Sequence, residues 1–189
     1  MRSVFDSVLA AIGLFVLLPV LIGLSLLVLV TMGQPVLFLQ QRSGKNGHPF
    51  TMVKFRTMNN ARNRYGELLP DIDRVSAAGR FLRTSRLDEL PGLYNIMRGE
   101  MHFVGPRPLL PETIGRLGKR GKIRGSIKPG LTGWAQVNGN TLLSLDRKIA
   151  LDIWYVRNAS LMLDLRIVWA TLRVMIGGER DTGRENPTV

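Results

Sequence analysis

Two adjacent carboxylates, Asp88 and Glu89, lie in the segment SRLDELPGLYN of a strongly basic chain. Pro91 favours a helix that begins close to them, because a proline deep inside a helix costs about 3 kcal/mol. In a first helical turn, free N–H groups and the helix dipole keep carboxylates ionised. An ionised aspartate can attack phosphorus to form an acyl phosphate, and two carboxylates can flank one divalent cation. The residues alone leave the alternative of two surface acids at a helix start.

Basic side chains that could bind phosphate lie on both sides of the acid pair. Arg83 precedes it, and Arg107 follows it between Pro106 and Pro108. The two proline rings restrict the backbone, so the Arg107 guanidinium is pre-positioned to fork onto a phosphate. The alternative is a turn residue that pairs with a local carboxylate such as Glu112.

The elements expected around these residues are short. Residues 36–40 and 50–55 are predicted to be strands around a Gly-containing loop, which indicates a hairpin. Lys54 and Arg56 then point the same way from the second strand, and we expect them to add to a basic pocket near the acid pair. Helices are predicted at 75–83, from 85–88 to Gly99, at 145–157 and at 161–176. Residues 59–73 are predicted to be loop with some helix, 128–140 loop, and 103–111 an extended segment.

An apolar segment near the N-terminus predicts a membrane element. No charged residue occurs from Ser7 to Gln41, and residues 8–32 are almost wholly apolar. A bilayer core requires about 20 apolar residues in a helix, so the segment is long enough to span. Pro19 removes a hydrogen bond near its middle and predicts a break. A kinked span and a helix that dips into the bilayer and returns are both compatible with this pattern.

The last predicted helix, residues 161–176, alternates apolar with charged residues and contains Trp169. This pattern suits a helix at a membrane surface, and an ordinary helix packed on a core is the alternative. The basic run at 116–128 is predicted to be a solvated face or a contact with lipid headgroups.

The composition narrows the class of partner. A chain of 189 residues is long enough for one domain with a core, and its net charge of +12 implies a polyanion. With no cysteine and only two histidines, disulfide frameworks, thiolate metal sites and a zinc site are not expected. No Walker loop, G-x-G-x-x-G or nucleophile elbow occurs, and no nucleic-acid-binding signature is found.

Five segments in order resemble the bacterial sugar transferases, the monotopic phosphoglycosyl transferases. They are QQRSGKNGHPFTMVKFRTM, SRLDELPGLYN, FVGPRPLL, KPGLTGWAQVNG and LDIWYV. The similarity runs from Phe5 to Asp164. It implies an α+β, helix-dominated fold with a re-entrant, proline-broken membrane helix, a small β-hairpin and several amphipathic interfacial helices. The expected divisions are a membrane-inserted helix at 1–33, a cytoplasmic and interfacial catalytic domain at 34–176 and a polar tail at 177–189.

The resemblance implies a reaction and a site. Asp88 attacks the β-phosphate of a UDP-sugar and releases UMP, and undecaprenyl phosphate then takes the sugar phosphate from the aspartate. Glu89 is its metal or acid–base companion, and both acids work with Mg²⁺. Arg107 and Arg83 contact phosphate. The expected substrate-binding set further includes Lys54, Arg56, Pro106, Gln136 and Asn138, and sugar specificity is expected in the loops at 59–73 and 133–143.

The resemblance also implies a location and partners. It places the chain at the cytoplasmic face of the bacterial inner membrane, in the first membrane step of polysaccharide or glycoconjugate assembly. The expected partners are the UDP-sugar, undecaprenyl phosphate, anionic membrane lipid and downstream glycosyltransferases, with a homodimer left open and no nucleic acid. The alternative without catalysis is a membrane-anchored subunit that binds anionic lipid or recruits glycosyltransferases.

Overall fold

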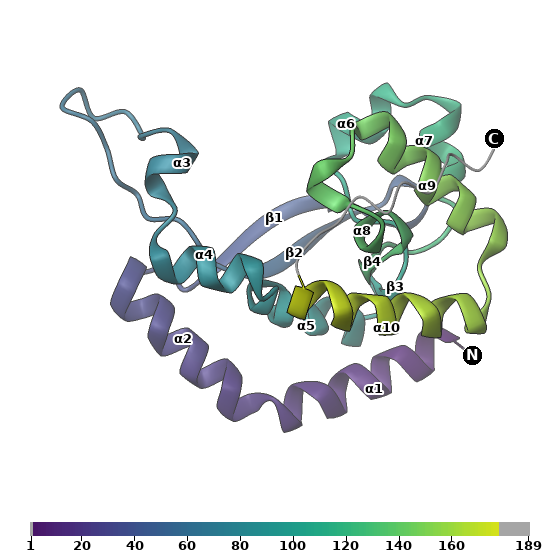
Figure 1. Cartoon of the computed structure of the whole chain (residues 1–189), viewed down its shortest axis with the longest axis horizontal. Coiled ribbons are helices and arrows are strands. Elements are labelled where there is room, and N and C mark those ends of the chain that lie inside the picture. The colour runs from purple at the N-terminus through teal and green to yellow at the C-terminus, as the bar shows by residue number, and fades with distance from the viewer. Residues whose placement is uncertain (1, 178–189) are drawn as a thin grey trace.

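A bent pair of helices runs along one side of the structure, and the other elements lie on its concave side (Figure 1). The computed structural model describes residues 2–177, so the predicted polar tail lies outside the described residues from residue 178 onwards. Helices predominate over two small two-stranded sheets, which confirms the α+β, helix-dominated class. Membrane insertion of the bent pair stays a prediction.

The helical pair consists of α1 (Arg2–Val16) and α2 (Leu18–Met32), which meet at an angle of 65°. Pro19 lies in the first turn of α2, where its missing N–H leaves no helical hydrogen bond unmade. The break predicted at Pro19 therefore begins at Leu17. No single helix within residues 2–177 is long and apolar enough to cross a bilayer, whereas α1 and α2 together meet that criterion by length and composition.

The concave side of the pair packs on the rest of the protein and the other side is uncovered. Ala10 of α1 and Val28 of α2 are fully buried, whereas Phe15 and Val30 are 80% and 84% exposed. The exposed apolar side chains of the pair include Val4, Phe5, Val8, Ile12, Phe15, Val16, Ile22, Leu26 and Val30.

The predicted hairpin is confirmed as β1 (Leu37–Ser43) and β2 (Pro49–Phe55), joined by a turn that contains the 3-10 helix η1 (Lys45–Gly47). The strands are antiparallel, from Leu37 opposite Phe55 to Ser43 opposite Pro49. After the hairpin come α3 (Asp71–Arg74) and α4 (Ala77–Thr84), which Ser76 caps by accepting a hydrogen bond from the Gly79 N–H.

The single helix predicted from residues 85–88 to Gly99 is two elements. A 3-10 helix, η2 (Leu87–Gly92), carries the acid pair and Pro91, and α5 (Leu93–Met97) follows. The tighter 3-10 ladder accommodates the proline at this position, whereas an α-helix interior would lose a hydrogen bond to it. Gly99, at φ 74°, ends the segment as predicted.

The segment 128–140, predicted to be loop, contains regular structure. Strand β4 (Gly130–Thr132) pairs in parallel with β3 (His102–Val104), and α8 (Trp134–Val137) and η3 (Asn140–Leu142) follow. Local glycines and a proline argue for loop, but the partner strand lies far away in the sequence and supplies the hydrogen bonds. The loop prediction for this segment was therefore wrong at β4 and α8.

The basic run at 116–128 is largely helical. It forms the end of α6 (Pro111–Arg116) and the whole of α7 (Lys119–Arg124). Arg124 is only 4% exposed, so the prediction of a wholly solvated face was wrong at this residue.

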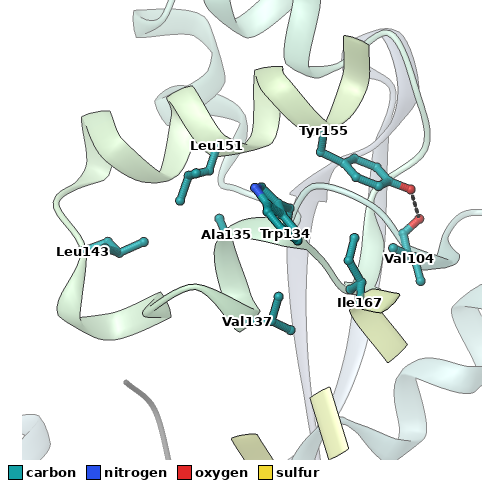
Figure 2. Close-up of a cluster of buried hydrophobic side chains, with 8 residues drawn as sticks. All are labelled: Val104, Trp134, Ala135, Val137, Leu143, Leu151, Tyr155 and Ile167. Atoms are coloured by element: carbon teal, nitrogen blue, oxygen red, sulfur yellow. Dashed lines mark hydrogen bonds between the residues drawn. The ribbon is translucent and has the colours of Figure 1, made fainter. Parts of the chain in front are cut away.

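The main core lies between α8, α9 (Leu145–Asn158) and α10 (Leu161–Gly177), as Figure 2 shows. Its buried side chains are Val104, Trp134, Ala135, Val137, Leu143, Leu151, Tyr155 and Ile167. The last helix packs one face on this core, as the second interpretation predicts, whereas contact of its outer face with a membrane stays a prediction. Ile167 is fully buried, while Trp169 is 59% exposed in a row of apolar side chains on the outer face.

Gly130 is predicted to tolerate no side chain. A Cβ there would lie 2.0 Å from the Gly105 backbone nitrogen, so Gly130→Ala must separate β3 from β4. We expect the free energy of unfolding to fall by about 1–3 kcal/mol or more, measured by thermal unfolding in detergent. The control is Gly115→Ala in α6, where a Cβ has open space; it should leave stability unchanged or raise it by up to about 1 kcal/mol. Equal effects of the two substitutions would contradict the packing argument.

Candidate active site

A cavity of about 560 Å³ opens between the hairpin, η2 and the loops on either side of them. Seven of its lining side chains are cationic and three are acidic, so it suits a ligand with several negative charges. Its lining includes Arg42, Lys54, Arg56, Arg74, Arg83, Arg86 and Arg107, the acids Asp71, Asp88 and Glu89, and the polar side chains Gln40, Thr57, Asn59, Asn60, Asn140 and Thr141.

The acid pair is turned towards this cavity by the start of η2. Arg86 precedes the helix in the left-handed conformation at φ 57°, and its carbonyl accepts a hydrogen bond from the Glu89 N–H at 3.2 Å. With about three residues per 3-10 turn, neighbouring side chains point roughly 120° apart. The two acids therefore have different surroundings although they are adjacent.

Glu89 is held between two cations. Its Oε1 lies 2.7 Å from the Lys54 Nζ and 2.6 Å from an Arg107 guanidinium nitrogen, and the residue is 6% exposed. Burial alone would raise the pKa of Glu89, but Arg107 and Lys54 outweigh it and lower the pKa to about 2. Glu89 is consequently ionised at any physiological pH and fixes both cations beside the cavity.

Asp88 has the opposite character. Burial and the neighbouring Glu89 charge raise the pKa of Asp88 to about 6, although Lys54, Arg107 and Arg83 oppose the shift. Within the described part of the chain its carboxylate makes no hydrogen bond or ion pair. Near neutral pH it is still mostly ionised, and it lines the cavity, where an ionised carboxylate can act as a nucleophile.

Two further predicted residues reach the cavity. Arg83 lines it and donates from Nε to the Thr57 hydroxyl at 2.8 Å. Arg56 lines it but is only 8% exposed, and it donates to the carbonyls of Met58 and Gln34. Arg56 therefore also fixes the chain between α2 and the hairpin.

Three of the predicted substrate-binding residues do not line the cavity. The Gln136 amide donates to the Leu131 carbonyl at 3.1 Å, and the Asn138 amide donates to the Trp134 carbonyl at 2.7 Å. Both are buried around α8. The Pro106 carbonyl accepts a hydrogen bond from the Gly130 N–H at 3.0 Å. These contacts give all three residues a place in the framework behind Arg107, and a direct contact with substrate stays a prediction for them.

The sequence analysis missed several lining residues. Arg42 shares one face of β1 with Phe38 and Gln40, at the strand period of two, and this alternation could have revealed it. The two loops expected to set sugar specificity do meet at the cavity, through Asn59 and Asn60 on one side and residues 140–141 on the other.

The acid pair fits a Mg²⁺ ion only if substrate phosphates supply further ligands to the same ion. Within residues 2–177, no group of three or more His, Asp or Glu side chains could hold a metal. Mg²⁺ is, however, commonly bound by one or two carboxylates, waters and substrate phosphates. The Asp88 carboxylate, which has no described protein partner, and the neighbouring Glu89 supply such oxygens.

Asp88→Asn is predicted to stabilise the protein in a pH-dependent way. With a folded-state pKa of about 6, the folded protein favours the protonated form of Asp88. The contribution of this acid to the free energy of unfolding is therefore fully present below pH 4 and is lost as the pH rises through 6. Asparagine cannot ionise. The variant should match the wild type near pH 4 and exceed it by about 1–3 kcal/mol at pH 7.5, in thermal unfolding with EDTA present. Equal stability at both pH values would contradict a partly buried carboxylate beside the charge of Glu89.

The chain resembles known proteins over most of its length. A family model described as bacterial sugar transferase matches residues 1–178. The chain is 42% identical to the uncharacterized sugar transferase EpsL of Bacillus subtilis, over 95% of this chain and 89% of that protein. It is 37% identical to the UDP-glucose:undecaprenyl-phosphate glucose-1-phosphate transferase of Escherichia coli, over 88% of this chain.

A third relative is the undecaprenyl-phosphate glucose phosphotransferase of Komagataeibacter xylinus, which is 35% identical over 91% of this chain. The chain spans only 38% and 35% of the lengths of these last two relatives. The match of the family model to nearly every residue confirms the resemblance carried by the five segments. The chain belongs to the bacterial sugar transferase family and is a transferase.

Proposed function

We propose that this chain transfers a sugar 1-phosphate from a UDP-sugar to undecaprenyl phosphate and releases UMP. The observation that carries this proposal is the division between two adjacent acids at a basic cavity: Glu89 is paired with two cations, and Asp88 has no hydrogen-bond or ion-pair partner among the described residues. The names of the relatives support the class of donor and acceptor.

In the first step, an Asp88 carboxylate oxygen attacks the β-phosphorus of the UDP-sugar. A new P–O bond forms to the aspartate, and the bond to the bridging oxygen breaks, so UMP leaves with that electron pair. In the second step, a phosphate oxygen of the lipid attacks the same phosphorus and the aspartyl P–O bond breaks. The product is the lipid diphosphate sugar, and the Asp88 carboxylate is regenerated.

Glu89 acts in this scheme through its two cationic partners. Because its pKa is about 2, it holds no proton to donate near neutral pH, so we assign it an electrostatic role rather than that of a general acid. It places Lys54 and Arg107 where negative charge accumulates on the transferred phosphoryl group. Asp88 and Glu89 would hold Mg²⁺, which supplies charge neutralisation on the diphosphate when bound.

We further propose that the bent helical pair enters the cytoplasmic face of the bacterial inner membrane and returns to it. The uncovered apolar side chains of α1 and α2, and the outer face of α10 with Trp169, support this placement. A lipid phosphate is then held at the depth at which the cavity meets the headgroups. Contacts with downstream glycosyltransferases and a homodimer stay predictions.

Asp88→Asn is predicted to reduce UMP release by at least about 1,000-fold, because it removes the attacking oxygen while keeping the shape of the side chain. The assay supplies Mg²⁺, undecaprenyl phosphate and a panel of UDP-sugars. The control is Glu112→Gln, the same kind of substitution at the start of α6, which does not line the cavity. Wild-type rates in Asp88→Asn would refute the assignment of the nucleophile.

A covalent intermediate is predicted when the lipid acceptor is withheld. A UDP-sugar labelled on the β-phosphate should leave label on the wild-type protein, with up to one UMP released per chain, and undecaprenyl phosphate should remove it. Asp88→Asn should retain none. Label transfer that requires both substrates together, with no labelled protein, would favour direct transfer instead.

Re-entry of the helical pair is predicted to place both of its ends on the cytoplasmic side. The chain has no cysteine, so Ser3→Cys and Lys119→Cys each introduce a single thiol. In intact cells, neither should react with a membrane-impermeant maleimide, and both should react after lysis. Labelling of only one of the two in intact cells would indicate a true span.

A further inference from the structure

The backbone on both sides of Arg107 is held through its carbonyl groups. Four consecutive carbonyls accept hydrogen bonds from three other elements, β4, α7 and β1: Pro106 from the Gly130 N–H at 3.0 Å, Arg107 from Arg124, Pro108 from Arg42 at 3.3 Å, and Leu109 from the Ser43 N–H at 2.9 Å. Pro106 and Pro108 have no N–H of their own. The position of Arg107 therefore depends on donors from elsewhere in the fold.

The donor to the Arg107 carbonyl belongs to a buried ion pair. The Arg124 Nε lies 2.8 Å from an Asp152 carboxylate oxygen, and the side chains are 5% and 3% exposed. The pair links α7 to α9, and a terminal guanidinium nitrogen of Arg124 extends from it to the Arg107 carbonyl. One planar guanidinium contacts both the Asp152 carboxylate and the Arg107 carbonyl, and a lysine ammonium is less suited to hold two acceptors in this fixed geometry.

Stability alone gives a weak account of this pair. Taking two charges out of water costs several kcal/mol per ion, and well-packed apolar residues of similar volume often serve the fold as well or better. The same two helices already share an exposed ion pair, Arg120 with Asp146 at 2.9 Å, and within residues 2–177 this pair makes no hydrogen bond to the Pro-Arg-Pro segment. The distinctive feature of the buried pair is its hydrogen bond to the residue that holds Glu89.

We propose that Arg124, oriented by Asp152, is a positioning residue for Arg107. It fixes the backbone from which the Arg107 guanidinium reaches Glu89 and the cavity. The chain of contacts runs from Asp152 through Arg124 and the Arg107 carbonyl to the Glu89 carboxylate. This inference rests on the transfer reaction proposed above, in which Arg107 contacts the phosphates.

The test replaces the pair by apolar residues, Arg124→Met with Asp152→Leu, alone and in an Arg107→Ala background. Two quantities are measured for each variant, the rate of UMP release and the dissociation constant of UDP by calorimetry. Thermal unfolding shows whether the variants are folded. The matched control is Arg120→Gln with Asp146→Asn, which removes the exposed pair between the same helices.

If Arg124 acts through Arg107, replacing the pair should lower UMP release about 10- to 100-fold and weaken UDP binding, because small displacements of a positioned group have effects of this size. In the Arg107→Ala background the same replacement should weaken UDP binding no further. The control should match the wild type in both measurements.

Unchanged UDP binding and UMP release in the folded variant would overturn the inference. A further, additive loss of UDP affinity in the Arg107→Ala background would also overturn it, because Arg124 would then act by another route. If the apolar pair does not fold, Arg124→Lys, which keeps a cation beside Asp152, is judged by the same two criteria. Wild-type protein that binds UDP but releases no UMP from any UDP-sugar would refute the proposed reaction, while the UDP measurements would still decide the role of Arg124.

Discussion

The candidate site depends on one buried carboxylate held by two cations. An ionised group as enclosed as Glu89 is tolerable only because Lys54 and Arg107 compensate its charge at hydrogen-bonding distance. The contact joins β2, η2 and the Pro-Arg-Pro segment at one oxygen atom. Each of these elements is short and would be poorly fixed by itself. The electrostatic requirement of Glu89 therefore determines the geometry of the cavity as well as its charge.

The same contact separates the chemistry of two neighbouring acids. Partial burial and, after it, the negative charge of Glu89 raise the pKa of Asp88 to about 6, and Lys54 and Arg107, which pair with Glu89, oppose this shift without cancelling it. Environments that shift two pKa values in opposite directions are a common way of giving two like groups different roles. A symmetrical arrangement, with one cation on each acid, would leave no carboxylate free to react.

Local patterns predicted the parts of this structure that depend on neighbouring residues. The hairpin, the helix start near Asp88 and the break near Pro19 follow from strand alternation and proline chemistry. The β3–β4 pair, the helix at Trp134 and the burial of Arg124 do not, because their partners lie far away in the sequence. The predicted site divides in the same way: acids and cations reach the cavity, whereas Gln136 and Asn138 complete the framework behind it.

Close backbone contacts between glycines next to the Pro-Arg-Pro segment limit which positions around the site can be substituted. At Gly105, Gly130 and Gly133, a Cβ would lie 2.8 Å or less from backbone atoms. Substitution of any of these glycines by a larger residue is therefore disfavoured, both in natural variation and in directed evolution. Asn59, Asn60 and the residues at 140–141 line the candidate active-site cavity and belong to loops that take no part in the glycine contacts. If the proposed reaction takes place in this cavity, a library that changes its sugar preference should therefore vary these loop positions and keep the three glycines. The three glycines would then stay unchanged while the loop residues around the cavity vary.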